Sequence, residues 1–221
     1  MEARRLGRTG HRSTVGVLGG AAFWAATPDE ATAGLELALA RGVNHLDIAP
    51  QYGAAEDAVG PHVPAARDRL FVAGKTLRTN PDGVRAQFDA TRRKLGCDVL
   101  DLYQAHAVTS LAELDRRADA LEAIVALRDA GATRFAGVTG HEHGAPAAHA
   151  EAVRRYDLDT VMFPVNAFLW GDPAYRDAAE VLLELCAERD VGVLAIKAGA
   201  RRPWDDGLPL TAALDGDDAT A

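Results

Sequence analysis

The sequence predicts an α/β protein, an incomplete (β/α)8 barrel of the TIM type with about seven strands. Short β-like segments alternate with longer segments of helical periodicity along almost the whole chain. The connections are short, so consecutive strands should be parallel and joined by right-handed crossovers. A doubly wound sheet also fits this alternation, but it normally carries a Gly-rich turn and a helix after its first strand. Here Gly19-Gly20 leads into AAFWAA and a new helix start, which favours the barrel.

Seven segments are predicted to be the barrel strands: 14–18, 43–48, 70–73, 99–104, 134–138, 160–163 and 191–196. Helix starts are marked by a capping residue followed by proline at Thr27-Pro28, Asn80-Pro81 and Asp172-Pro173. Helix ends are marked by glycine, which suits a left-handed cap, at Gly42, Gly96 and Gly131. These signals delimit six helices between the seven strands.

The eighth strand–helix unit of a complete barrel is not found in the sequence. Only KAGARRPWDDGLPLTAALDGDDATA follows Ile196. We therefore predict a barrel domain over 1–197 and an acidic, Gly/Ala-rich, disordered tail over 198–221. Without an eighth strand, the first and seventh strands would be open edges.

Composition restricts the classes of function. The 221 residues are 48% hydrophobic with a net charge of −8, which suits a folded domain and disfavours nucleic acid or an anionic membrane as partner. No apolar run approaches the ~18 residues that span a bilayer, and the basic N-terminus lacks the apolar stretch of a secretory signal. Cys97 and Cys186 lack metal-type spacing, so we expect a cytoplasmic protein. The sequence does not indicate an oligomeric state.

An aspartate interrupts an apolar strand in the segment HLDIAPQYG, residues 45–53. Asp47 either caps the next helix or lies beside a group that it neutralises. Catalytic groups of a (β/α) barrel lie at the carboxyl ends of its strands. The ionisable residues at or just beyond those ends are Asp47, Tyr52, Lys75 and His106. We therefore expect these four residues to meet at one mouth of the barrel.

These residue types can together deliver a proton. A tyrosine hydroxyl ionises at about pH 10 and donates poorly at neutral pH unless a nearby cation stabilises the phenolate. A buried lysine keeps its charge when a carboxylate lies beside it. We therefore expect Asp47 to keep Lys75 charged, and Lys75 to assist Tyr52. Tyr52 would protonate an oxygen that His106 orients or polarises.

Four segments around these residues resemble successive signatures of the aldo-keto reductase superfamily: NHLDIAPQYGAAEDAVG, LFVAGKT, FDATRRKLGCDVLDLYQAH and LEAIVALRDAGATRFAGVTGH. Order and spacing are kept from about Leu6 to Lys197. The resemblance implies a barrel enzyme that reduces a small aldehyde or ketone with NADPH or NADH and without a metal, or oxidises an alcohol in reverse. It implies that Tyr52 is the general acid, tuned by Lys75 and Asp47, and that His106 orients the carbonyl.

The resemblance also implies a nicotinamide site, to which it assigns Gly20, Thr139, Met162 and Lys197. Thr139 can supply a hydroxyl to the carboxamide, but Gly140 cannot supply the amide side chain that relatives have beside it. Met162 replaces a glutamine that many relatives place under the ring, and Lys197 replaces a stacking aromatic residue. The phosphates and adenosine would be bound by the part of the barrel that we do not find.

Two further residues, Trp24 and His141, are expected to line the substrate mouth. Trp24 could equally pack over the top of the barrel. A metal site at His141-Glu142-His143 is also conceivable, since alternate residues of a strand share a face. This segment lies in a Gly-flanked loop without a third ligand, so we expect no metal.

Three other interpretations stay open. The same four residues could run a redox-free dehydration, isomerisation or other lyase reaction beside a carbonyl by acid–base chemistry alone. The barrel could be catalytically idle and bind a ligand or partner as a regulatory module, although four intact site residues argue against that. The chain could also be the product of a truncated or frame-shifted gene.

Overall fold

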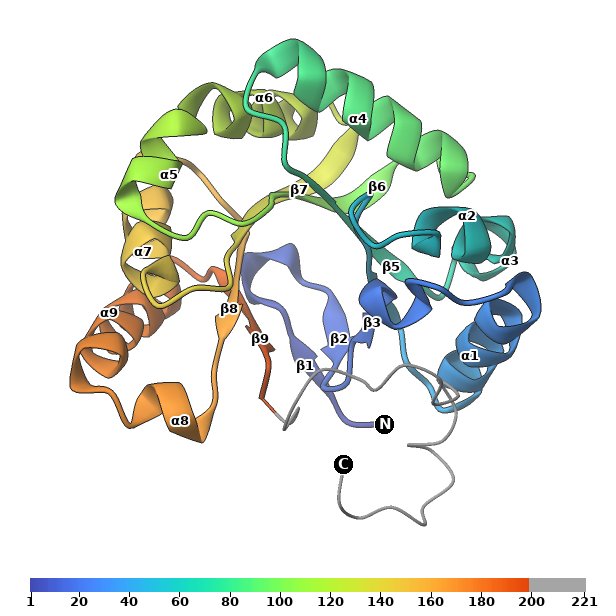
Figure 1. The fold of residues 1–221 in the computed structure, drawn as a ribbon, viewed down its shortest axis with the longest axis horizontal. Helices are drawn as coiled ribbons and strands as arrows, with labels where there is room; N and C mark the ends of the chain where they lie inside the picture. The colour runs from blue at the N-terminus through green and yellow to red at the C-terminus, as the bar shows by residue number, and fades with distance from the viewer. Residues whose placement is uncertain (199–221) are drawn as a thin grey trace.

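The barrel strands of this protein form one parallel sheet that curls into an incomplete barrel (Figure 1). A computed structural model describes residues 1–198. Seven strands follow one another in chain order, and every neighbouring pair is parallel. This arrangement confirms the prediction of an incomplete (β/α)8 barrel. The predicted tail lies outside the described residues except for Ala198.

The barrel strands are short. Their bounds are β3 (Leu18–Gly19), β4 (His45–Asp47), β5 (Phe71–Thr76), β6 (Leu100–Ala105), β7 (Thr133–Thr139), β8 (Thr160–Pro164) and β9 (Gly192–Ile196). The parallel register places Asp47 opposite Ala73 and Lys75 opposite Gln104. The polar residues of neighbouring strands therefore come to the same end of the sheet.

The predicted first strand, 14–18, is wrong over most of its length. The barrel strand β3 begins only at Leu18, and Thr14 instead ends a separate antiparallel hairpin. The chain turns between them, where the Thr14 hydroxyl donates to the carbonyl of Gly16 at 2.8 Å. Only the first and last residues of the predicted strand, Thr14 and Leu18, lie in strands, and these are two different elements.

The hairpin lies within the curve of the sheet (Figure 1). It consists of β1 (Ala3–Arg5), the 3-10 turn η1 (Gly7–Thr9) and β2 (Arg12–Thr14). Arg8 reaches across to Asp159 at 2.9 Å, and Arg5 pairs with Asp190 at 2.6 Å. The hairpin is therefore fixed to the segments that precede β8 and β9.

The helices cover the outer face of the sheet (Figure 1). Their bounds are α1 (Pro28–Ala40), α2 (Ala55–Val59), α3 (Val63–Ala66), α4 (Pro81–Lys94), α5 (Leu111–Arg116), α6 (Ala118–Asp129), α7 (Ala145–Arg155), α8 (Ala167–Trp170) and α9 (Pro173–Glu188), with 3-10 turns η2 (Gly20–Phe23) and η3 (Gly60–His62). No helix in the described part of the chain is both long and apolar enough to cross a membrane.

The predicted helix signals take the expected conformations. Thr27 and Glu30 form the reciprocal capping box at the start of α1. Asn80 and Asp172 each accept a backbone hydrogen bond at the start of α4 and α9. The three glycines after helices have positive φ angles: Gly42, Gly96 and Gly131.

Apolar side chains form a layer between strands and helices and a smaller cluster inside the barrel. The inner cluster consists of Leu6, Phe71, Ala73, Leu102, Met162 and Leu194. Within residues 1–198, β3 and β9 are the two edge strands of the sheet. A cavity of about 370 Å³ is lined by both edges, by the hairpin and by Asp47 and Met162.

Candidate active site

A buried ion pair joins the ends of β4 and β5. Lys75 is fully buried and its ammonium contacts the carboxylate of Asp47, which is 7% exposed. The second carboxylate oxygen of Asp47 accepts from the side chain of Gln104 at 3.3 Å. Since a buried charge is tolerated only when it is paired and hydrogen-bonded, the pair explains how a strand of the core holds a lysine.

Tyr52 is brought onto this pair by the loop between β4 and α2. Its hydroxyl lies 3.2 Å from the Lys75 Nζ, which is also 4.9 Å from the ring centroid. The loop turns through Gly53, whose φ is +54°. A Cβ at Gly53 would lie 2.3 Å from the carbonyl oxygen of Trp24, which accepts from the backbone N–H of Ala54 at 3.0 Å. A glycine is therefore required for this position of the tyrosine.

His106 lies directly after β6 and faces Tyr52 edge-on, with the ring centroids 5.9 Å apart. Burial lowers the pKa of His106 to about 3, with further contributions from the charges of Lys75, His141 and Arg117. The next residue, Ala107, has a φ of +61°, which only glycine adopts without strain. The backbone turns sharply there, between the hydrogen bonds of His106 to Thr76 and of Val108 to Thr139.

The two mouth residues expected from the sequence both flank this group. His141 lies in the loop after β7, with its Nε2 3.3 Å from the Nε2 of His106. Trp24 is 57% exposed and touches the Tyr52 loop through its backbone.

Of the positions expected to bind the nicotinamide carboxamide, Thr139 suits that role and Gly140 does not. The Thr139 hydroxyl, at the end of β7, is buried and has no hydrogen-bond partner among the described residues. Gly140 does not fit the amide-bearing position, because a Cβ would lie 2.3 Å from the Val108 carbonyl oxygen. Close packing of the two loops excludes any larger side chain.

The other three assigned residues lie at different depths. Gly20 is packed against β4, where a Cβ would lie 2.8 Å from Ile48 Cγ1. The side chain of Met162 belongs to the inner apolar cluster and borders the same cavity as Asp47. Lys197 follows β9, is exposed, and after burial is the largest cause of the lowered pKa of His141. The charge of Lys197 thus disfavours protonation of His141 at the mouth.

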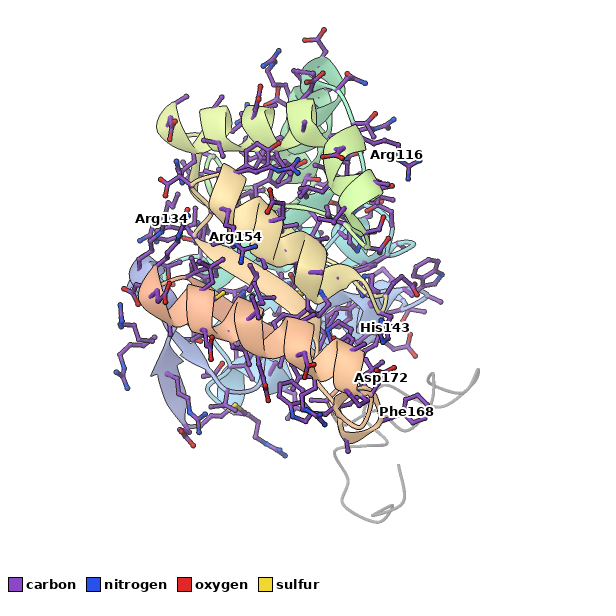
Figure 2. All side chains as sticks on the ribbon, turned by 90° about the vertical axis from the view of Figure 1, so that its left-hand side faces the viewer. Arg116, Arg134, His143, Arg154, Phe168 and Asp172 are labelled. Atoms are coloured by element: carbon purple, nitrogen blue, oxygen red, sulfur yellow. The ribbon has the colours of Figure 1, made fainter. Side chains whose placement is uncertain are left out.

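The two histidines of the segment His141-Glu142-His143 do not converge. His143 bonds to Asp172 at 3.0 Å, whereas His141 faces His106. Figure 2 shows His143 and Asp172 near Phe168, at the end of the molecule opposite Arg134. Within residues 1–198, no group of three or more His, Cys, Asp or Glu side chains is placed to hold a metal ion.

Two glutamines of the site were not singled out from the sequence. Gln51 lies 3.2 Å from the Nδ1 of His106, and Gln104 contacts Asp47. The sequence could have indicated Gln104, because its amide interrupts the otherwise apolar end of the buried strand β6, LDLYQA. Gln51 lies in a loop, where a polar residue gives no such signal.

Comparison with known proteins places this chain in a family. The family model described as Aldo/keto reductase family matches residues 16–200. A D-threo-aldose 1-dehydrogenase of Pseudomonas sp. is 31% identical over 207 residues, which cover 78% of this chain and 60% of that protein. An L-galactose dehydrogenase of Arabidopsis thaliana is 29% identical over 156 residues, which cover 63% and 49%. The chain thus spans less than two thirds of the length of these curated relatives.

A solved structure shows the same fold. The aldo-keto reductase of Bacillus halodurans in its holo form superposes with a TM-score of 0.74 at 22% identity, over 94% of this chain and 72% of that one. At this identity the likeness concerns the fold alone. The family model, in contrast, covers all seven barrel strands and the ion pair of Lys75 and Asp47. The chain therefore belongs to the aldo/keto reductase family, a family of oxidoreductases.

Proposed function

We propose that this protein is an NAD(P)H-dependent oxidoreductase that interconverts the carbonyl and alcohol forms of a small molecule. One observation carries the proposal: the buried ammonium of Lys75 touches both the Asp47 carboxylate and the Tyr52 hydroxyl. A cation so placed favours the phenolate, and a hydroxyl whose anion is stabilised is the better proton donor.

The proton moves between one oxygen of the protein and one of the substrate. In the reducing direction the carbonyl oxygen takes the proton of Tyr52, and the phenolate that remains is stabilised by Lys75. Asp47 holds Lys75 in place and balances its charge. His106 and the groups hydrogen-bonded to it orient the carbonyl oxygen. The chemistry that NAD(P)H would supply when bound is a hydride for the carbonyl carbon.

The Thr139 hydroxyl, which has no hydrogen-bond partner within residues 1–198, supports a nicotinamide at the end of β7. Lys197 and Gly20 would border it, with Met162 beneath. The relatives named above are dehydrogenases of an aldose and of L-galactose, which favours a polyhydroxylated substrate. We therefore propose aldoses, in the oxidising direction, and small aldehydes, in the reducing direction, as the first substrates to assay.

The experiment that tests the proposal compares the wild type with Tyr52→Phe. Turnover is measured with both cofactors in both directions, after a titration of each cofactor by tryptophan fluorescence. We expect the variant to lose more than nine tenths of its turnover, with an unchanged circular dichroism spectrum and cofactor affinity. Tyr156→Phe, which changes a tyrosine after α7, is the matched control and should retain full turnover. Retention of more than a tenth of the activity by Tyr52→Phe would contradict the proposed role.

A redox-free reaction on the same residues is the second candidate. It is favoured by Gly140, whose close packing leaves no amide beside Thr139 for a carboxamide. The two candidates separate in one assay, since an isomerase or dehydratase would convert its carbonyl substrate without any nicotinamide present. Substrate conversion that depends on Tyr52 but not on cofactor would decide for this candidate.

A further inference from the structure

A glutamine of the barrel interior lies beside the ion pair. Gln104 is fully buried, and its side-chain amide nitrogen donates to the Oδ1 of Asp47 at 3.3 Å. Because an ionised carboxylate can only accept, the NH2 end of the amide must face Asp47. The other carboxylate oxygen, Oδ2, accepts from the Lys75 ammonium. The two oxygens of Asp47 are therefore bound by donors from two different strands, β6 and β5.

The side-chain amide of Gln104 makes no second polar contact within residues 1–198. Its Oε1 is buried and has no hydrogen-bond partner there. A buried acceptor without a partner costs free energy, which a methionine of similar length would avoid. The hydrogen bond to Asp47 is thus the one polar contact in the described part of the chain that accounts for a glutamine at this position.

The next strand leaves room for the Gln104 side chain. The parallel register places Gln104 between Lys75 on β5 and Gly137 on β7, and Gly137 lies opposite Thr160 on β8. A Cβ at Gly137 would lie 3.2 Å from the Gln104 Cγ and 2.3 Å from the Thr160 Oγ1. Any side chain at position 137 would therefore crowd Gln104, and the glycine lets it reach Asp47.

Resting on the proposed function, we infer that Gln104 is a positioning residue for proton transfer by Tyr52. Asp47 holds the Lys75 ammonium beside the Tyr52 hydroxyl only while its carboxylate keeps one orientation. The hydrogen bond from Gln104 fixes the second carboxylate oxygen and so opposes rotation of that group. A displaced ammonium would stabilise the phenolate less, because the attraction between charges falls with distance. Gln104 thus acts on Tyr52 through Asp47 and Lys75.

Two substitutions that keep the length of the side chain separate a positioning role from a structural one. Gln104→Met removes the donor. We expect kcat to fall about tenfold or more, the equivalent of one hydrogen bond to a charged group, while the substrate KM and the Kd of NADPH change less than about twofold.

Gln104→Glu makes the donor depend on pH. Its carboxyl has no hydrogen to donate at high pH, but at low pH it takes up a proton that it can donate to Asp47. The kcat of this variant, divided by the wild-type kcat at the same pH, should therefore rise at least about fivefold from about pH 9 to about pH 6. A purely structural role would not produce this recovery. Gln87→Met, on the outer helix α4, is the matched control and should leave kcat and its pH dependence unchanged.

Nitrogen-15 NMR tests the hydrogen bond independently of turnover. The chain has three glutamines, Gln51, Gln87 and Gln104, so glutamine-labelled full-length protein gives three side-chain NH2 signals, which the two methionine variants assign. The Gln104 signal should exchange with solvent more slowly than the Gln87 signal, and only the Gln104 signal of these two should shift in Asp47→Asn.

The results that overturn the inference differ from those that overturn the proposed function. A Gln104 signal that Asp47→Asn leaves unmoved would overturn the inference, whether or not the protein reduces carbonyls. So would a Gln104→Met variant with wild-type kcat, or a Gln104→Glu variant without recovery at low pH, even if Tyr52→Phe proves inactive and the proposed function stands. The kinetic comparison needs no Asp47 variant, so it decides the question if Asp47→Asn does not fold.

Discussion

Removing either charge of the Lys75–Asp47 pair should destabilise the fold strongly. Lys75 is 0% exposed, so Asp47→Asn leaves an ammonium in the core without a counter-charge, beside a neutral amide and the Tyr52 hydroxyl at 3.2 Å. Breaking a buried pair by removal of one partner costs about 3–5 kcal/mol. Because the hydrogen bond to Tyr52 remains, we expect a loss of about 3 kcal/mol in the free energy of unfolding. Lys75→Met should cost a similar amount, since Asp47 would keep only the contact with Gln104.

The double variant Asp47→Asn/Lys75→Met buries no charge, so it should be no less stable than either single variant. The coupling free energy would then be about 3 kcal/mol. Urea unfolding monitored by circular dichroism, with an unchanged denaturant slope, gives all four values. The pair of Arg85 and Asp82, whose side chains are 54% and 95% exposed, is the matched control and should couple by less than about 1 kcal/mol. Additive losses at Lys75 and Asp47 would refute the reasoning.

Three further perturbations have defined outcomes. Gly53→Ala places a Cβ on a residue with a positive φ and against the Trp24 carbonyl oxygen. We expect the free energy of unfolding, measured in urea, to fall by about 1–3 kcal/mol, and kcat to drop strongly. Ala107→Gly removes the backbone strain of an alanine in the left-handed region and should raise the melting temperature. Burial lowers the pKa of His45 to about 3 and of His149 to about 4, from 6.5. Both histidines stay neutral in the folded protein, whereas in the unfolded chain they are protonated below pH 6.5. Protonation of the unfolded chain should therefore lower the free energy of unfolding by up to about 2 kcal/mol per histidine at pH 5, as measured by urea unfolding. A stability that is flat from pH 7 to 5 would contradict the last prediction.

The repeating part of the fold was readable from the sequence because its signals are local. A capping threonine with glutamate three residues later forms the same two hydrogen bonds wherever a helix starts, as Thr27 and Glu30 do. A glycine after a helix adopts a positive φ for steric reasons alone. Strands buried on both faces appear as apolar runs, and six of the seven lie within a few residues of their predicted positions.

The N-terminal hairpin was missed because its partners are distant in sequence. Its strands have only three residues each and pair antiparallel over Ala3–Arg5 and Arg12–Thr14. The strand propensity of such short, arginine-rich segments is weak, and what fixes them is the pairing of Arg5 and Arg8 with aspartates far along the chain. Local pattern contains no information on such contacts.

In the site, the sequence predicted which residues meet but not how they are oriented. Parallel register alone brings Asp47 and Lys75 to the same end of the sheet. The contacts of His106 with Gln51 and His141 depend on loop conformation and on ring rotation, which residue spacing does not specify. The tight packing of Gly140 against Val108 was likewise invisible, although the missing amide itself was evident.

The hairpin also sets an order of events when the chain is made. Its first 14 residues leave the ribosome early, but Arg8 must wait for Asp159, 151 residues later, and Arg5 for Asp190, 185 residues later. Strands β3 to β9 can add one by one in chain order as they emerge, since each pairs with its predecessor. Contacts of such large sequence separation carry the greatest loop-closure entropy and form late. The hairpin can therefore be fixed to the barrel only after the segments that precede β8 and β9 have been made.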